Sequence, residues 1–377
     1  MRIGVIGGGQ LAQMMALAAM PLGLRVHALD PAVDACAGDV APLEVAAFDD
    51  LAALHRFSDI CDVITFDFEN VSAPALAELA ALRPVRPNPL SLATAQDRAA
   101  EKALFARIGT AVASFAVIDS REQIEAAADT VEFPAILKTR RFGYDGKGQI
   151  NVPTAAALAD ACTRLGNAPC VLESRVRFRR ELSIVAVRGL DGQMLCYPLV
   201  ENLHVDGILS ATLAPACVSN AMVASARLCA ERVAEALDYV GVFAIEFFDL
   251  DGVLVANEMA PRVHNSGHWS IEGAVTSQFE NHMRAVTGLP LGDTSAVGAS
   301  CMLNWIGEMP DRAAALSVPG LHWHDYGKSA RAGRKVGHAT ITAVDRQSLA
   351  ERLLLLAEKL ERHGQIAPVI ERLSESA

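Results

Sequence analysis

The segment that says most about fold and function reads Asn257-Glu258-Met259-Ala260-Pro261-Arg262-Val263-His264-Asn265-Ser266-Gly267-His268-Trp269. It follows a hairpin signal at Asp251-Gly252, and the first strand of that hairpin carries a further carboxylate, Glu246. So many acids, amides and imidazoles within one strand and one loop are too polar for the edge of a core. The combination suits a site that holds metal-bound phosphate and performs acid–base chemistry beside it.

Glu246 and Glu258 lie in or directly after otherwise apolar strand patterns. A carboxylate there is costly unless it is paired or bound to metal, and magnesium favours a few carboxylates together with phosphate oxygens. A two-residue Asp-Gly loop would place Glu246 opposite Asn257, so we expect a three-residue loop with Gly252 in the left-handed region, which puts both glutamates on one face. The alternative is a pair of structural salt bridges.

Composition excludes several classes of protein. The chain has 377 residues, enough for two or three domains, and its net charge of −11 argues against a nucleic-acid-binding protein. The first residues read as a β-strand, with no signal peptide, and no apolar run is long enough to span a membrane. The eight cysteines form no C-x-x-C pair, which favours reduced thiols in a cytoplasmic enzyme.

Strands and helices alternate in the first part of the chain. Residues 2–6, 25–29 and 63–66 read as strands separated by helical patterns, which predicts a parallel, doubly wound α/β domain. A long amphipathic helix is expected over residues 221–237 and a strand over residues 299–306. The end of the chain is expected to be β-rich from 322 to 344, closed by one helix around residues 349–361.

A glycine-rich loop follows the first strand. Gly7-x-Gly9-x-x-Ala12, with Asp30 beyond the next strand, fits a nucleotide-binding fingerprint in which helix N-terminal amides hold a phosphate. The fingerprint alone is weak. A different phosphate ligand or a tight strand-to-helix turn is the favoured interpretation over a dinucleotide.

A second glycine-rich loop follows Lys138, which ends an apolar strand. It contains Gly143, Gly146 and Gly148 around Lys147, a composition suited to a lid over a triphosphate. The spacing does not match a P-loop. An ordinary hairpin loop is the alternative, and the carboxylates downstream, Glu173 and Glu181, favour the nucleotide.

Five motifs occur along the chain in this order: Gly7-Gly8-Gly9-Gln10-Leu11, residues 142–149, residues 201–208, Asn257 to His268, and residues 333–338. Together they resemble the 5-(carboxyamino)imidazole ribonucleotide synthases, a family of ATP-grasp carboxylases in purine biosynthesis. The resemblance extends from residue 1 to about residue 360. It implies a Rossmann-like preATP-grasp domain (1–89), an ATP-grasp unit (90–308) with a lid at about 112–180, and a small β-rich C-terminal domain (309–377).

The resemblance also implies an activity. The enzyme would be an ATP-dependent carbon–nitrogen ligase in which ATP and bicarbonate form carboxyphosphate. This breaks down to carbon dioxide and phosphate, and the amine of 5-aminoimidazole ribonucleotide captures the carbon. The implied cofactors are ATP and Mg²⁺, and the implied assembly is a cytoplasmic homodimer without nucleic-acid or membrane partners.

Roles for individual residues follow from the same resemblance. It places ATP against Arg98, Lys138, Gly143, Gly146, Lys147, Gly148, Glu173, Val176, Glu181, His204, Asn257 and Glu258, with Glu173 and the Val176 backbone at adenine and Glu181 at the ribose. It places magnesium on Glu246 and Glu258. It places the aminoimidazole ribonucleotide on Gln10, Leu11 and Glu69, with its phosphate on Lys328, Arg334 and Lys335. It gathers Tyr144, Asp145, Arg262, His264 and Asn265 around bicarbonate and the reacting amine, with His264 as a proton relay and Asp145 as a group that orients the amine.

Other functions fit the sequence less well. Another ATP-grasp ligase, such as a formate-using transformylase or a biotin carboxylase, would lack the Tyr144-Asp145 pair and the His264-Asn265 motif. A nicotinamide-dependent oxidoreductase would use the segment from Gly7 to Asp30. A nucleotide-binding regulator without catalysis is disfavoured by intact Lys138, Glu246, Glu258 and Arg262.

Overall fold

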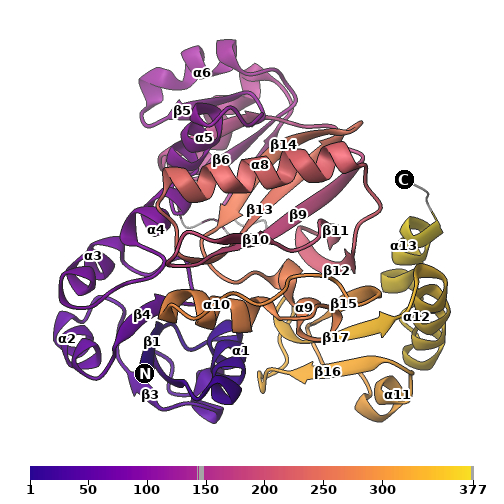
Figure 1. The fold of residues 1–377 in the computed structure, drawn as a ribbon. Coiled ribbons are helices and arrows are strands. Elements are labelled where there is room, and N and C mark those ends of the chain that lie inside the picture. Colours follow the sequence, from indigo (N-terminus) through magenta and orange to yellow (C-terminus); the bar gives the residue numbers. More distant parts are fainter. Residues whose placement is uncertain (142, 144–147, 375–377) are drawn as a thin grey trace.

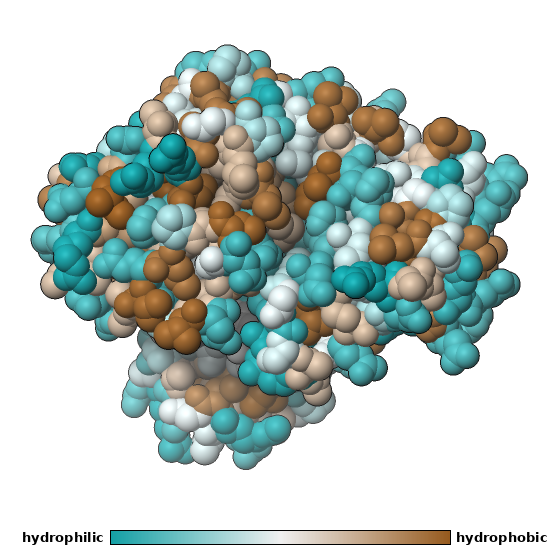
Figure 2. All heavy atoms as spheres, turned by 90° about the horizontal axis from the view of Figure 1, so that it is seen from below, coloured by the Kyte–Doolittle hydropathy of each residue, from teal (hydrophilic) through white to brown (hydrophobic). Residues whose placement is uncertain are grey.

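The computed structural model describes residues 1–141, 143 and 148–374 (Figure 1). Three β-sheets organise this part of the chain. Among the described residues, no helix is both long and apolar enough to cross a membrane. On the face drawn in Figure 2, apolar side chains form small separate groups among hydrophilic ones.

The N-terminal sheet is parallel, with strand order β3-β2-β1-β4. Its strands are β1 (Arg2–Ile6), β2 (Arg25–Asp30), β3 (Leu43–Val45) and β4 (Val63–Phe66). The helices that follow them are α1 (Gln10–Ala19), η1 (Met20–Leu22), η2 (Cys36–Asp39), α2 (Leu51–Asp59) and α3 (Ala73–Leu82). The expected doubly wound domain is confirmed, and the carboxyl ends of β1, β2 and β4 meet at one edge.

A small antiparallel sheet, drawn at the top of Figure 1, has strand order β5-β8-β6-β7. Its strands are β5 (Phe115–Ile118), β6 (Ala135–Thr139), β7 (Gln149–Val152) and β8 (Cys170–Ser174). It packs with η3 (Arg121–Gln123), α6 (Ile124–Thr130), η4 (Ala155–Ala157) and α7 (Leu158–Arg164) around its own apolar core. Helices α4 (Pro89–Ala95) and α5 (Arg98–Arg107) lead into it from the first domain.

The largest sheet has nine strands in the order β14-β13-β9-β11-β12-β15-β17-β16, and β10 pairs with the far end of β9, opposite β13 and on the same edge as β11. The strands are β9 (Arg180–Arg188), β10 (Met194–Cys196), β11 (Val200–Val205), β12 (Ile208–Ala214), β13 (Gly241–Leu250), β14 (Val253–Ala260), β15 (Ala299–Ile306), β16 (Leu321–Asp325) and β17 (Lys335–Ala343). Because β15 pairs with β17, this sheet is continuous across the boundary expected at residues 308 and 309.

Helices cover the large sheet in distinct places (Figure 1). They are α8 (Asn220–Ala236), η5 (Asn265–Gly267), α9 (Ser270–Gly273), α10 (Gln278–Thr287), α11 (Arg312–Leu316), α12 (Arg346–Leu360) and α13 (His363–Ser374). Helix α10 contacts both α1 and β13, and one core joins residues of all three elements, so the N-terminal domain and the sheet share a packed interface. Helix α12 corresponds to the single closing helix expected around residues 349–361. The structure has a second closing helix, α13, which packs against α12.

The hairpin β13–β14 corrects one expectation and confirms another. Leu250 pairs with Val253, so the loop is the two-residue Asp251-Gly252 turn, with φ of 50° and 93°, and not the three-residue loop expected. The register instead shifts between Glu246 and Phe247, where Asn257 is the extra residue of a β-bulge. Glu246 therefore pairs with Glu258, and the two carboxylates share one face as predicted.

Candidate active site

The two glutamates lie on β13 and β14, the last two strands at one end of the large sheet. The Glu258 Oε2 atom lies 3.1 Å from Arg98, and the Glu258 side chain is 42% exposed while that of Glu246 is 16% exposed. Burial, and then the charge of Glu258, raise the pKa of Glu246. Burial also raises the pKa of Glu258, but Arg98 and Lys138 outweigh it and the net shift is downward. The pair thus concentrates negative charge where a cation can enter.

The donors around this pair fit a magnesium ion. Among the described residues, no group of three His, Cys, Asp or Glu side chains could hold a metal by itself. Magnesium usually binds through one or two carboxylates together with substrate phosphates, and Glu246 and Glu258 supply the two carboxylates of such a set. The Oδ1 atom of Asn257 is also buried, and the described part of the chain gives it no hydrogen-bond partner. The β-bulge therefore leaves an oxygen beside the pair.

Lysine side chains converge beside Arg98. The Nζ atoms of Lys138 and Lys102 both lie 3.1 Å from the same oxygen of Glu173, and all three residues are buried. Burial lowers the pKa of Lys138, and the opposite effect of the Glu173 carboxylate offsets this only in part, so the net shift is downward. Three cations here face the carboxylates of Glu173 and Glu258, an arrangement suited to the oxygens of a triphosphate. Lys102 was not among the residues predicted for the ATP site, although it lies one helical turn after Arg98 on α5.

The structure uses Glu173 in a way that the sequence did not indicate. We expected it at adenine, and its Oε2 atom instead holds the two lysines. Its Oε1 atom is buried, and in the described segments it has no hydrogen-bond partner, so the adenine contact stays a prediction. Glu181 lies 2.8 Å from His204, and this carboxylate raises the pKa of His204 although burial lowers it.

The second half of the site lies where the N-terminal and C-terminal domains meet. Arg262, directly after β14, lies 2.6 Å from Glu69, which follows β4. Lys328, after β16, donates to the side chain of Gln10 at the start of α1. Arg334 donates to Ser329, and Lys335 opens β17 nearby. Two of these contacts, Lys328 with Gln10 and Arg262 with Glu69, thus join residues that lie far apart in the sequence.

The segment from His264 to His268 is fastened to the large sheet by side chains. Asn265 and Asn304 exchange two amide hydrogen bonds, with N···O distances of 3.2 and 2.6 Å. His264 contacts Ser266 and lies 3.5 Å from Glu246. The side-chain amide of Asn265 therefore serves mainly to hold this segment against Asn304 on β15.

Four predicted residues, Tyr144, Asp145, Gly146 and Lys147, lie outside the described residues. Gly148 is described, with φ of 72°, and a Cβ atom there would lie 2.7 Å from Thr139 Oγ1. Gly143 is half-buried, and Val176 lies in the segment between β8 and β9. Leu11 is buried in the first turn of α1.

The first glycine loop is closed by two carboxylates of the chain itself. The Gly8 amide donates to Asp30 at 2.7 Å, and the Gly9 and Ala12 amides donate to Asp67 at 2.9 and 3.2 Å. A Cβ atom on Gly7, whose φ is 104°, would lie 1.7 Å from Asp67 Oδ1. These amides are the groups that would hold a dinucleotide pyrophosphate, so the loop favours a tight strand-to-helix turn over a nicotinamide site.

Asp67 supplies a pH-dependent test of this loop. Burial raises its pKa from 3.8 to about 6, so the stability that its protonated form contributes is complete below 3.8 and is lost as the pH rises through 6. Asp67→Asn removes this titration. Relative to the parent protein, the variant should gain about 2 kcal/mol of unfolding free energy between about pH 4.5 and about pH 8. Urea unfolding of both proteins across this range measures the change, and a pH-independent difference would contradict it.

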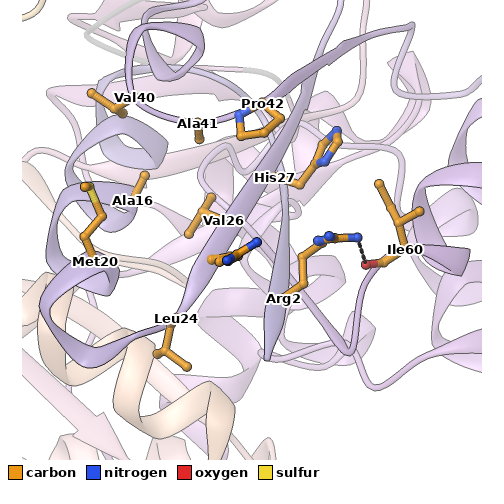
Figure 3. Close-up of a pocket in the computed structure, with 11 residues that line it drawn as sticks. Arg2, Ala16, Met20, Leu24, Val26, His27, Val40, Ala41, Pro42 and Ile60 are labelled. Atoms are coloured by element: carbon orange, nitrogen blue, oxygen red, sulfur yellow. Dashed lines mark hydrogen bonds between the residues drawn. The ribbon is translucent and has the colours of Figure 1, made fainter.

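The cavity drawn in Figure 3 belongs to neither half of the site. It has a volume of about 440 Å³ and is lined by residues that include Arg2, Arg25, Val26 and Met20. Arg2 and Arg25 begin β1 and β2, whereas Gly7 and Asp30 lie at the carboxyl ends of those strands. The cavity is therefore at the opposite edge of the N-terminal sheet.

Comparisons with known proteins agree along the whole chain. Family models match at residues 1–96 (ribonucleotide synthetase preATP-grasp domain), 103–279 (ATP-grasp domain) and 300–352 (phosphoribosylaminoimidazole carboxylase C-terminal domain). The N5-carboxyaminoimidazole ribonucleotide synthase of Pseudomonas aeruginosa is 50% identical over 353 residues, covering 94% of this chain and 98% of its own. That of Bacillus subtilis is 38% identical over 349 residues, 90% of each chain.

Solved structures give the same result. The Thermus thermophilus N5-carboxyaminoimidazole ribonucleotide synthetase superposes with a TM-score of 0.91 at 48% identity, covering 95% of this chain and 98% of that one. The Aspergillus clavatus N5-carboxyaminoimidazole synthase, solved with ADP and 5-aminoimidazole ribonucleotide, superposes with a TM-score of 0.88 at 30% identity, covering 96% and 98%. The expected fold, a preATP-grasp domain, an ATP-grasp unit and a small C-terminal domain, is confirmed.

Proposed function

Since this chain belongs to the family of N5-carboxyaminoimidazole ribonucleotide synthases, we propose that its site is divided between ATP and an aminoimidazole ribonucleotide. The reaction is the ATP-dependent formation of N5-carboxyaminoimidazole ribonucleotide from 5-aminoimidazole ribonucleotide in purine biosynthesis, and the chain is the ligase that catalyses it. The carbon comes from bicarbonate. Its oxygen attacks the γ-phosphorus of ATP and ADP leaves. The resulting carboxyphosphate breaks down to carbon dioxide and phosphate, and the substrate amine attacks the carbon dioxide and loses a proton.

The ATP half consists of Arg98, Lys102, Lys138, Glu246 and Glu258. The two glutamates would hold magnesium, which when bound neutralises phosphate charge. The three cations orient the β- and γ-phosphates and stabilise the charge that develops during transfer. Support comes from their convergence: Arg98 lies 3.1 Å from Glu258, and both lysines lie 3.1 Å from Glu173.

The ribonucleotide half consists of Gln10, Glu69, Lys328, Arg334 and Lys335. Lys328, Arg334 and Lys335 supply positive charge for the substrate phosphate. Glu69 and Gln10 supply acceptors for its polar groups, and Glu69 also holds Arg262 in place. Carboxyphosphate is labile in water, so the segment around Lys147 is proposed to cover the site during the reaction.

The observation that carries this proposal is the pairing of Glu246 with Glu258 beside three convergent cations. One assay tests it. Purified protein, magnesium-ATP and ¹³C-bicarbonate are mixed with and without 5-aminoimidazole ribonucleotide, and ADP and the ¹³C-carbamate signal are measured. We expect ADP and carbamate to form in equal amounts and only with the ribonucleotide present. Glycinamide ribonucleotide with formate is the control substrate pair, and ADP release with that pair alone would overturn the proposal.

The assembly and location of the protein are also proposals. We propose that the chain works as a cytoplasmic homodimer, as the family resemblance implies. Light scattering at micromolar concentration tests the assembly, because a mass equal to one chain would contradict it.

A further inference from the structure

Beneath His264 lies a row of four buried polar side chains, which we call the polar row: Thr212, Asn202, Ser183 and Ser266. Each is at most 5% exposed. They come from β12, β11, β9 and η5, and consecutive members are hydrogen-bonded at 3.0, 2.9 and 2.8 Å. The row ends at His264, whose Nδ1 atom lies 2.8 Å from the Ser266 hydroxyl.

The sheet register explains why these side chains meet. Glu258 pairs with Glu246 and Glu246 pairs with Ser183 across β14, β13 and β9, so all three side chains share one face. On the next two strands Asn202 pairs with Thr212 on that same face. The polar row therefore continues the line of the two carboxylates across the sheet.

The direction of the hydrogen bonds in the row is fixed at its His264 end. The backbone N–H of Ser266 can only donate, and it points at Nδ1 of His264 from 3.3 Å. A proton on Nδ1 would place two donors face to face, so Nδ1 must accept. The Ser266 hydroxyl then donates to Nδ1, Ser183 donates to Ser266, Asn202 donates to Ser183, and Thr212 donates to Asn202.

The protonation of the imidazole follows from this direction. Because Nδ1 accepts from the Ser266 N–H and from the Ser266 hydroxyl, it carries no proton, and only Nε2 can hold one. With Nδ1 as acceptor, that proton is on Nε2. The Nε2 atom lies 3.5 Å from a Glu246 oxygen, so the N–H points toward the ATP half of the site.

We propose that Thr212, Asn202, Ser183 and Ser266 are positioning residues that hold His264 as its Nε2–H tautomer. In this form His264 donates a hydrogen bond to an oxygen of bicarbonate or of the transferring phosphoryl group. It does not accept the proton of the substrate amine, a role that the sequence analysis had allowed. The identity of that oxygen rests on the proposed function, whereas the tautomer rests on the polar row alone.

The tautomer is measured directly by long-range ¹H–¹⁵N correlation spectra of ¹⁵N-labelled protein without ligands. The His264 signals are those lost in His264→Asn. We expect Nε2 in the protonated range and Nδ1 in the unprotonated range. Ser183→Ala and Ser266→Ala should shift both signals toward a mixture of tautomers and lower kcat about 10- to 100-fold, with KM for ATP little changed. Ser266→Thr, which keeps the hydroxyl, should restore the parent spectrum.

Ser270→Ala is the matched control, because Ser270 is equally buried in α9, just after this segment, and among the described residues its hydroxyl bonds Gly267 and Gln278 and no member of the polar row. It should leave the His264 signals unchanged. A protonated Nδ1 in the parent protein would overturn the proposal. So would a loss of kcat in both alanine variants with unchanged His264 signals, which would show a purely structural role. Failure of the proposed function would appear separately, as an absence of ribonucleotide-dependent ADP release in a protein that still shows the Nε2–H signal.

Discussion

Glu258→Gln is expected to lower kcat/KM for ribonucleotide-dependent ADP formation by about a thousandfold. The carboxylate faces Glu246 across the hairpin, and with one charge removed the pair can no longer hold a divalent cation against the triphosphate. A loss of this size equals about 4 kcal/mol of transition-state stabilisation, within the range attributed to metal-assisted charge neutralisation. Coupled detection of ADP measures it, with magnesium titrated to saturation.

The fold should survive Glu258→Gln, because the amide oxygen can still accept from Arg98. Thermal unfolding should therefore stay cooperative and close to that of the parent. Glu235→Gln is the matched control, since Glu235 is exposed on α8 and contacts neither half of the site. If Glu258→Gln unfolds non-cooperatively, or if it keeps most of its activity, the metal assignment is wrong.

Glu173→Gln should lower the free energy of unfolding by about 3 to 5 kcal/mol. The Glu173 side chain is 5% exposed and its carboxylate lies 3.1 Å from two lysine Nζ atoms, so the substitution leaves two buried cations without their counter-charge. Burial raises the pKa of Glu173, but Lys138 and Lys102 lower it by more than burial raises it, which favours the ionised form. Urea unfolding at about pH 7 measures the loss.

Three comparisons make this prediction specific. Adding Lys102→Met to Glu173→Gln should recover part of the stability, because one of the two uncompensated cations is removed. Magnesium-ATP should stabilise Glu173→Gln more than the parent, because its phosphates replace the missing charge. Asp238→Asn, which breaks the exposed pair with Arg188, should change stability by no more than about 0.5 kcal/mol. Equal losses at both pairs would contradict the account given for Glu173.

The sequence predicted the layers and the hairpin, but it could not show how register is set. Glu246 and Glu258 were placed on one face through a longer turn, whereas the structure reaches the same pairing with a two-residue turn and a bulge at Asn257. Turn residues carry a local signal in the sequence. A bulge depends on which partner strand and which side chains surround it, so it had no signal to detect.

The site residues that were not predicted have a similar explanation, because their roles depend on contacts between distant parts of the chain. The importance of Lys102 and Ser183 comes from partners far along the chain, Glu173 and Ser266. The first glycine loop left its ligand open, and the positions of Asp30 and Asp67 decided the question. Long-range contacts of this kind cannot be read from one sequence by spacing.

The β-bulge at Asn257 has a consequence for sequence alignment and loop engineering. The bulge lies between the turn and Glu258. The hairpin tip could therefore be lengthened or shortened by an even number of paired positions without moving Glu258 to the other face. Deleting Asn257 alone would keep every carboxylate in the chain yet turn Glu258 away from Glu246. An aligned relative with a gap at this one position should therefore be treated as lacking the paired carboxylates of the proposed metal site, however well its motifs are preserved.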